Sequence, residues 1–304
     1  MKPKVVFKPS QIKLIEEATA AEFQSAKDAG EIGYMARMLV QVTMPHSKPA
    51  TDRFVRTNGE YTVQMIASDV EIGLPYGSIP RLVLAWLTSE AVRTKSPNLE
   101  LGRSFNGFLR DVGILAEGRT ASGGKRGVGK IAGRQTLALF NAMVTWSRKH
   151  ETGRTQEHAQ ITKGYDVAWD PIKADDLTLW TSTVNLSHEF YSEIISHPVP
   201  IDMRALRMLK RSPMRLDIYC WLTWRLSYLN RETTIPWEYL KLQFGAGYGD
   251  DGQGLRDFKK AFLEALRAVQ TVYTKARVQP TEGALILKPS PTHVPLTNIR
   301  LLNP

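Results

Sequence analysis

A glycine-rich basic segment between Gly124 and Lys130 has the residue types that could surround a phosphate group. Its spacing fits G-x-x-x-x-G-K, the pattern of nucleotide-binding loops whose backbone amides and lysine cradle the phosphates. In such loops the next residue is Ser or Thr, which holds magnesium, and a hydrophobic strand comes before the loop. Here the next residue is Ile131, and no such strand precedes the glycines. We therefore expect no nucleotide site. We interpret the glycines as a linker into a helix, with Lys125 and Arg126 available to the phosphates of nucleic acid.

Histidine, acidic and tyrosine residues give little support to metal-dependent or covalent catalysis. None of the six histidines pairs with another at metal-ligand spacing. The adjacent acids Asp175-Asp176 and Asp250-Asp251 fall in expected loops, where turn or capping roles are more common than a two-metal site. Tyr191 lies on an amphipathic segment and is expected to pack against a core. We therefore expect a non-enzymatic protein without a cofactor or a metal, and we disfavour a tyrosine-dependent nicking enzyme.

The composition favours a polyanionic partner. The 304 residues carry a formal net charge of +10, and the isoelectric point is about 9.6. A basic balance of this size favours nucleic acid over a membrane. No apolar stretch approaches the roughly 20 residues that span a bilayer, and the N-terminus has no secretory signal. The single cysteine, Cys220, fits a reducing compartment. We therefore expect a cytoplasmic protein with no membrane contact.

The stretch Gly123–Glu151 begins as this glycine-rich basic loop and is predicted to become a long amphipathic helix. At about 100° per residue, one face gathers cations and amides within about 60° of one another: Lys130, Arg134, Asn141, Thr145 and Arg148. The opposite face gathers Leu139, Phe140, Met143 and Trp146. Such a helix can bury its apolar face and lay its polar face along a DNA groove. An ordinary surface helix is the alternative interpretation.

The order of elements around this helix predicts a winged-helix domain. The order is helix, short strand, helix, long helix, strand, strand, with the last two strands at Gln156–Trp169 and Trp180–Leu186. The same order recurs later, with a long basic helix at Leu255–Val272 and strands at Tyr273–Val278 and Ala284–Lys288. This recurrence predicts tandem copies of one module, and chance recurrence of a common order is the alternative.

The residues before the first module predict a helix and a β-hairpin. Ser10–Ala29 has a one-sided apolar stripe, and Met35–Met44 and Tyr61–Ala67 resemble strands. Asn58-Gly59 is a strong reverse-turn pair. We therefore predict an α+β fold, in which two tandem winged-helix domains follow an N-terminal helix and β-hairpin extension. The predicted boundaries are 1–75, 76–197 and 198–304.

The second long helix repeats the polar and apolar faces of the first. Arg256, Lys260 and Arg267 share one face, with Glu264 among them. Lys275 and Arg277 are predicted on the following strand, within reach of phosphates. A basic cluster from Arg204 to Arg215 could contact phosphates or be a solvated face. Arg134, Gln135 and Asn141 could pair with base edges. The expected DNA-binding residues are Lys125, Arg126, Lys130, Arg134, Gln135, Asn141, Arg148, Arg207, Arg211, Arg256, Lys260, Arg267, Lys275 and Arg277.

Several short segments resemble the plasmid-encoded RepA family of replication initiators. The resemblance covers most of the chain and is most specific from about Gly33 to Gly113. It is carried by Gly33-Tyr-Met-Ala-Arg37, Thr57-Asn-Gly59, Gly73-Leu-Pro-Tyr-Gly-Ser-Ile-Pro-Arg81, Trp86-Leu-Thr-Ser-Glu-Ala-Val-Arg-Thr-Lys-Ser96, Leu101-Gly-Arg-Ser104 and Phe108-Leu-Arg-Asp-Val-Gly113.

The resemblance implies binding to repeated double-stranded DNA sites in a plasmid origin, opening or marking of that origin, and recruitment of host replication proteins. It also implies that the protein could form a homodimer and repress its own promoter. The residue pattern independently supports only DNA binding by tandem modules. A winged-helix transcriptional repressor is the first alternative, and a rolling-circle nicking enzyme is the less favoured one.

Overall fold

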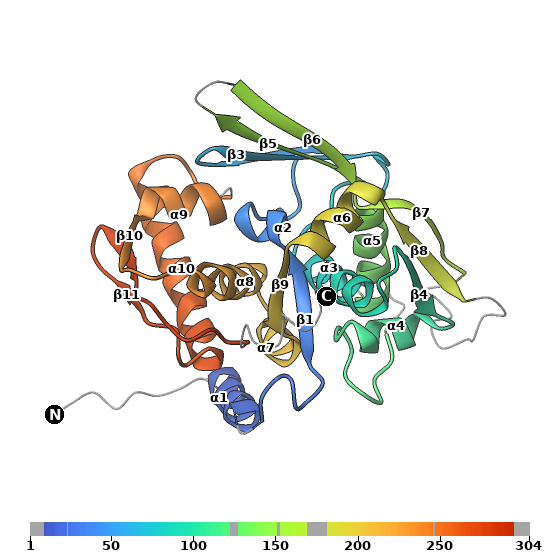
Figure 1. The fold of residues 1–304 in the computed structure, drawn as a ribbon, viewed down its shortest axis with the longest axis horizontal. Helices are drawn as coiled ribbons and strands as arrows, with labels where there is room; N and C mark the ends of the chain where they lie inside the picture. Colours follow the sequence, from blue (N-terminus) through green and yellow to red (C-terminus); the bar gives the residue numbers. More distant parts are fainter. Residues whose placement is uncertain are drawn as a thin grey trace.

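A computed structural model describes residues 9–22, 24–121, 127–150, 153–168, 181–245 and 247–294 of the chain (Figure 1). The second of the two predicted modules has the simpler topology. Its elements in chain order are α8 (Pro213–Ser227), β10 (Thr233–Pro236), α9 (Trp237–Phe244), α10 (Gly252–Val272), β11 (Val278–Pro280) and β12 (Ala284–Leu287). The three strands form an antiparallel sheet in the order β10-β12-β11. This is a winged-helix arrangement with α10 as its third helix.

The first module has the same topology. Its elements are α3 (Ser78–Thr94), β4 (Asn98–Gly102), α4 (Phe105–Asp111), α5 (Val128–Phe140), β7 (Thr162–Asp166) and β8 (Ser182–Leu186). Its sheet has the order β4-β8-β7, so the corresponding strands are paired in the same way in both modules. The α+β fold with two tandem winged-helix modules is therefore confirmed.

An inserted hairpin separates α5 from β7 and corrects the predicted long helix. The helix ends at Phe140, and Ala142–His150 (β5) and Gly153–Gln160 (β6) are antiparallel strands. In β5 burial alternates, because Ala142 and Val144 are buried while Met143 is exposed. The stretch from Ala142 to His150 pairs in antiparallel register with an earlier strand, and this tertiary pairing overrides a pattern that also fits a helix. The single strand predicted at Gln156–Trp169 is divided into β6 and β7, whereas the strand predicted at Trp180–Leu186 is confirmed as β8 (Ser182–Leu186).

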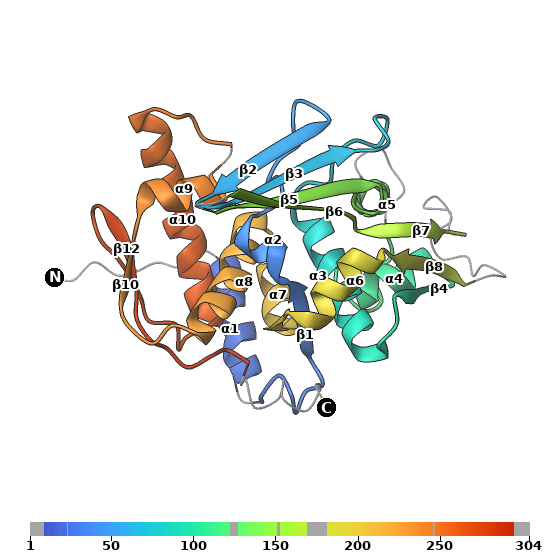
Figure 2. The same cartoon turned by 45° about the horizontal axis from the view of Figure 1, so that its top comes forward.

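The N-terminal extension supplies two more strands to this hairpin. Strands β2 (Arg53–Asn58) and β3 (Tyr61–Ala67) form the hairpin around Asn58-Gly59, where Gly59 has a φ of +59°. They complete a four-stranded sheet in the order β2-β3-β5-β6. Figure 2 shows this sheet along one side of the molecule, reaching from α9 toward α5. The predicted turn is confirmed, but the strand predicted at Met35–Met44 is not the partner of β3.

That region instead contains β1 (Ile32–Ala36) followed by α2 (Arg37–Gln41). Strand β1 pairs with β9 (Pro198–Asp202), which begins at the predicted boundary between the modules. The remaining helices are α1 (Pro9–Glu22), shorter than predicted, α6 (His188–Ser196) and α7 (Met203–Leu209). Helix α1 packs against α10 and α7, and β2 packs against α9. The extension therefore contacts both modules, and the predicted domain boundaries stay a prediction.

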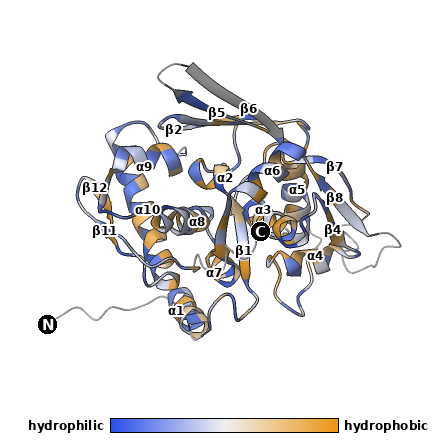
Figure 3. Cartoon of the chain, in the orientation of Figure 1, coloured by the Kyte–Doolittle hydropathy of each residue, from blue (hydrophilic) through white to orange (hydrophobic). Residues whose placement is uncertain are grey.

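The hydrophobic core is one continuous cluster that runs through both modules. Figure 3 shows hydrophobic residues along β1 and the central helices. Charged side chains are also buried there. Arg81 on α3 is 2% exposed, and its Nε and Nη2 donate to the two carboxylate oxygens of Asp217 on α8 at 2.7 and 2.8 Å. Its other hydrogen bonds go to the carbonyls of Met44, Pro45 and Gly77. All five guanidinium N–H groups thus have an acceptor.

His46 is the second donor to Asp217, with 2.7 Å between Nε2 and Oδ2. Burial raises the pKa of Asp217, but Arg81 and the hydrogen bond from His46 lower it more, so the carboxylate is charged. Nearby, the buried Arg56 of β2 donates to Thr43 Oγ1 and to the carbonyl of Gln243 on α9. Burial lowers the pKa of Arg56 to about 10. The two modules and the extension therefore meet in one buried polar network.

We predict that Asp217→Asn lowers the free energy of unfolding by about 3–5 kcal/mol, because it leaves the charge of Arg81 buried without a counter-ion. Urea unfolding followed by circular dichroism measures this change. Glu60→Gln is the matched control, because it breaks the exposed Arg148–Glu60 pair, and such pairs contribute about 0–1 kcal/mol. Equal effects of the two substitutions would contradict the role of Asp217.

We predict that His46 makes the folded state sensitive to acid. Burial lowers its pKa below the ordinary value of 6.5, although the bond to Asp217 opposes this shift. Below pH 6.5 the unfolded chain therefore takes up a proton at this position more readily than the folded chain, and the free energy of unfolding falls. His46→Gln keeps a donor but does not titrate, so it should reduce the loss of stability between pH 7 and the folded-state pKa. His197→Gln, which replaces an exposed histidine, is the control, and equal effects of the two substitutions would contradict the role of His46.

Candidate nucleic-acid interface

Helix α10 presents a row of cations to solvent. Its N-cap is Asp251, whose side chain accepts from the amide of Gly254, and its inner face buries Phe258, Phe262, Leu266 and Val269. The outer face carries three exposed cations, Arg256, Lys260 and Arg267, which we call the α10 ridge. In the described part of the chain, no carboxylate lies within 4 Å of their nitrogens. The helical pattern predicted this placement, and DNA binding by the ridge stays a prediction.

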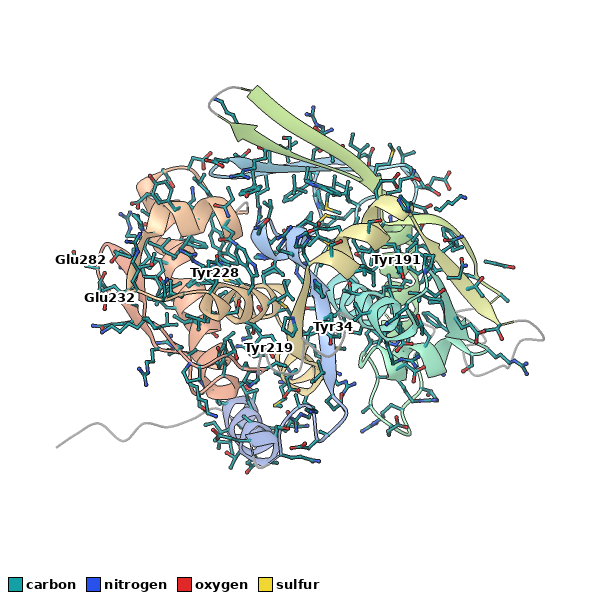
Figure 4. All side chains as sticks on the ribbon, in the orientation of Figure 1. Tyr34, Tyr191, Tyr219, Tyr228, Glu232 and Glu282 are labelled. Carbon is teal, nitrogen blue, oxygen red and sulfur yellow. The ribbon has the colours of Figure 1, made fainter. Side chains whose placement is uncertain are left out.

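Helix α10 ends at Val272 as predicted, but the strand predicted at Tyr273–Val278 begins only at Val278. Lys275 and Arg277 are exposed and therefore lie in the loop between α10 and β11, not on a strand. The tip of the wing, which is the turn between β11 and β12, carries the acid Glu282, and Glu232 directly precedes β10. Figure 4 shows Glu232 and Glu282 at the outer edge of the second module, beside its sheet. Glu232 pairs with Lys288 at 3.6 Å. The predicted DNA-binding cations of this module therefore lie on α10 and in the following loop, not at the tip of the wing.

Helix α5 offers a shorter polar surface than predicted. Lys130 and Arg134 are exposed, but Arg134 donates to the backbone carbonyls of Glu71 and Ile72 at 3.0 and 3.1 Å. Gln135 is only 2% exposed, and its Oε1 accepts from the amide of Tyr76 at 2.7 Å. The prediction that Gln135 reads base edges is wrong, because its amide group is used inside the protein. It holds the segment that enters α3.

The rest of the predicted polar face does not exist as one face, because the helix ends first. Asn141 is the C-cap of α5, and its Nδ2 donates to the carbonyl of Leu137 and to Tyr165 Oη. Arg148 lies on β5, forms an ion pair with Glu60 at 3.1 Å and stacks on the ring of Tyr61. Neither residue extends the surface formed by Lys130 and Arg134. Lys125 and Arg126 lie outside the described residues.

The basic cluster around α7 is partly neutralised. Arg207 donates to both carboxylate oxygens of Glu31 at 2.8 and 2.9 Å, and Arg204 forms an ion pair with Asp202 at 2.7 Å. Arg211 is exposed and lines a cavity between α1 and α7. The predicted cations Arg207 and Arg211 therefore lie in a hollow outside the α10 ridge.

Groups considered for catalysis are placed as packing residues. Tyr191 is half-buried on α6, where it packs against the core (Figure 4). Cys220 is buried on α8, and burial raises the pKa of its thiol. Within the described ranges, no group of three or more His, Cys, Asp or Glu residues could hold a metal ion. Of the helices in those same ranges, none is both long and apolar enough to cross a membrane.

The buried network of Arg81, Asp217, His46 and Arg56 was not predicted from the sequence. A usable indication was present, because Arg81 and Asp217 each stand inside an otherwise apolar stretch of helix, IPRLVLAWL and RLDIYCWLTW. A charge at such a position requires a buried partner. Which charge pairs with which follows only from the packing of α3 against α8.

A family model described as "Plasmid encoded RepA protein" matches residues 74–239. The chain belongs to this family. The matched region begins in the segment that Gln135 and Arg81 hold in place, and it ends in the first turn of α9, before the α10 ridge. The resemblance to the RepA family is thereby confirmed, and of the segments that carried it, those from Leu74 to Gly113 lie within the matched region.

Two solved structures are similar in fold. One is the crystal structure of selenomethionine derivatives of domains 2 and 3 of RctB, with a TM-score of 0.52, 11% sequence identity, and coverage of 83% of this chain and 97% of that chain. A second structure of RctB domains 2–3 has a TM-score of 0.49, 11% identity, and coverage of 83% and 96%. A search of curated proteins gave no match. At 11% identity the first structure supports the tandem architecture alone.

We predict that Gln135→Met lowers the free energy of unfolding by about 1–3 kcal/mol, because it leaves the amide of Tyr76 without an acceptor while nearly keeping side-chain volume. Urea unfolding measures the loss, with Lys130→Met on the exposed face as the control. The ratio of specific to non-specific DNA affinity in a gel shift should stay unchanged for Gln135→Met. A tenfold fall in that ratio at unchanged stability would show that Gln135 contacts bases.

Proposed function

We propose that the protein initiates plasmid replication by binding repeated double-stranded DNA sites in the origin through its two winged-helix modules. Membership of the plasmid-encoded RepA family supports the replication role. The observation that carries the DNA-binding part is the α10 ridge, an exposed row of cations on the third helix of a winged-helix module. In that fold, the third helix is the element that enters the major groove.

The α10 ridge supplies affinity in this proposal. Arg256, Lys260 and Arg267 contact DNA phosphates, and Lys275 and Arg277 extend the contact beyond the helix. Each neutralised phosphate releases counterions, so affinity falls as salt rises. Lys130 and Arg134 on the corresponding helix of the first module make a second, smaller contact. Arg134 is exposed, and its bonds to Glu71 and Ile72 use Nε and Nη2 and leave Nη1 as the candidate group for base recognition, since a guanidinium can pair with guanine in the major groove.

A fixed distance between the DNA contacts of α5 and α10 would favour DNA sites whose two halves have a matching spacing. The Arg81–Asp217 pair joins α3 to α8, the first helices of the two modules. A rigid connection means that α5 and α10 meet DNA with constant separation, and such geometry selects sites whose halves have matching spacing. This supports recognition of repeats of constant length, as the family role requires.

The further parts of the proposal rest on the family alone. They are recruitment of host replication proteins, a homodimeric form and action in the cytoplasm. We also propose that the protein is not an enzyme and needs no cofactor. A transcriptional repressor would use the same DNA contacts. Footprinting with a reagent specific for unpaired bases separates the two roles, because an initiator opens origin DNA and a simple repressor does not.

We predict that replacing Lys260 and Arg267 together with alanine reduces the slope of log affinity against log salt by about two, since each cation accounts for about 0.9 of the slope. Gel shifts of an origin fragment between 50 and 200 mM salt measure the slope.

Arg93→Ala with Arg119→Ala is the matched control, because it removes two exposed cations from the first module, away from α10. It should leave the slope unchanged. If the ridge variant behaves like this control, the α10 ridge faces solvent in the complex and the proposed DNA contact is wrong.

A further inference from the structure

A basic cavity lies where α1 crosses α7 and the N-terminal end of α8. Its volume is about 780 Å³. Figure 1 shows α1 and α7 side by side at the lower edge of the molecule, and the two helices are in contact. The cations of the lining come from three helices and the turn before α8: Lys13, Arg204, Arg207, Lys210, Arg211 and Arg215. Glu17 is the single acid among the lining residues in the described part of the chain.

Neighbouring acids neutralise only part of this charge. Asp202 and Glu31 hold Arg204 and Arg207, and Glu17 pairs with Lys13 at 3.6 Å across exposed side chains. Arg215 is 4.0 Å from the exposed Glu264. Among the described residues, no carboxylate lies within 4 Å of Lys210 or Arg211. The acids therefore fix two arginines in the wall, and the cavity keeps an excess of positive charge.

Lys210 is held at the cavity without a counter-ion. Its Nζ donates to the carbonyls of Gly113 and Ile114 at 2.7 and 3.1 Å. An ammonium group has three donors, so one stays available. Burial lowers the pKa of Lys210, and the positive charges of Arg207 and Arg211 lower it further. A bound anion would relieve this repulsion.

The first turn of α8 adds to the positive electrostatic potential of the cavity. Ser212 lines the cavity and is the N-cap of α8, with Pro213 at the first helical position. The N-terminus of a helix carries a partial positive charge that favours anions. The volume falls within the range of about 300–1,000 Å³ that is usual for small-molecule sites. A concave site of this size suits a compact anion better than the convex backbone of a duplex.

We propose that this cavity binds a compact polyphosphate anion, such as inorganic tripolyphosphate or the triphosphate group of a nucleotide, held by Lys13, Lys210, Arg211 and Arg215. None of the three α10 ridge residues lines this cavity. It assigns Arg211 to a small ligand in place of DNA. Because α1 forms one wall, the ligand also ties the N-terminal helix to α7 and α8.

Isothermal titration of the full chain with sodium tripolyphosphate in 0.15 M salt tests the site. We expect one saturable site, and sodium sulfate at equal ionic strength should not reproduce it. Arg211→Glu should weaken binding by about tenfold or more, because a charge-assisted contact becomes a repulsion. Lys13→Glu, on a different wall of the cavity, should weaken it as well. Both side chains are exposed, so both variants should fold, and circular dichroism checks this.

Arg267→Glu is the matched control on the α10 ridge. Arg267→Glu should leave the tripolyphosphate affinity within about twofold and weaken duplex binding. Arg211→Glu should weaken tripolyphosphate binding and leave the duplex affinity within about twofold. Absence of saturable binding, or loss of it in Arg267→Glu alone, would overturn the proposal. Loss of duplex binding in Arg211→Glu would show that the cavity contacts DNA phosphates. An unchanged duplex affinity in Arg267→Glu would count against the α10 ridge and leave the cavity proposal standing.

Discussion

The buried pair of Arg81 and Asp217 determines how the two modules are oriented. Removing two charges from water costs several kcal/mol per ion, and that cost is recovered only when the geometry is good and every donor has an acceptor. Here all five guanidinium N–H groups of Arg81 are satisfied, and His46 donates to the same carboxylate. Rotation of one module against the other would separate these partners. The pair therefore favours a single arrangement, which hydrophobic contact alone would specify less strictly.

The N-terminal extension belongs to this arrangement. Met44, Pro45 and His46 supply groups that surround the ion pair, and Arg56 joins β2 to α9 through Gln243. Gln243 returns a hydrogen bond from its Nε2 to the carbonyl of Val40. A segment that looks like an accessory hairpin in the sequence is thus part of the contact between modules. Its loss would expose charges as well as apolar surface.

The sequence-based prediction was most accurate for a helix with one apolar and one basic face. The aromatic residues of α10 recur at helical spacing with cations opposite them, and the structure has that helix and those faces. It was wrong at β5, where apolar residues at helical spacing also alternate, because pairing with β3 cannot be read from β5 alone. The prediction for Gln135 was wrong for a similar reason, since its hydrogen-bond partner, the amide of Tyr76, lies 59 residues away in the sequence. The positions of the α10 ridge residues follow from local helical periodicity and can be predicted from the sequence. The partners of buried polar groups are set by tertiary contacts and cannot.

The pairing of β1 with β9 has a consequence for synthesis of the chain. Ala36 pairs with Pro198 and Ile32 with Asp202, so the two strands are separated by more than 160 residues. At about 5–20 residues per second, the ribosome needs on the order of ten seconds or more to deliver β9 after β1 has emerged. Contacts of such high sequence separation also slow folding. During that interval the first strand lacks its partner, and the nascent chain depends on chaperones or on its own charge to remain unaggregated.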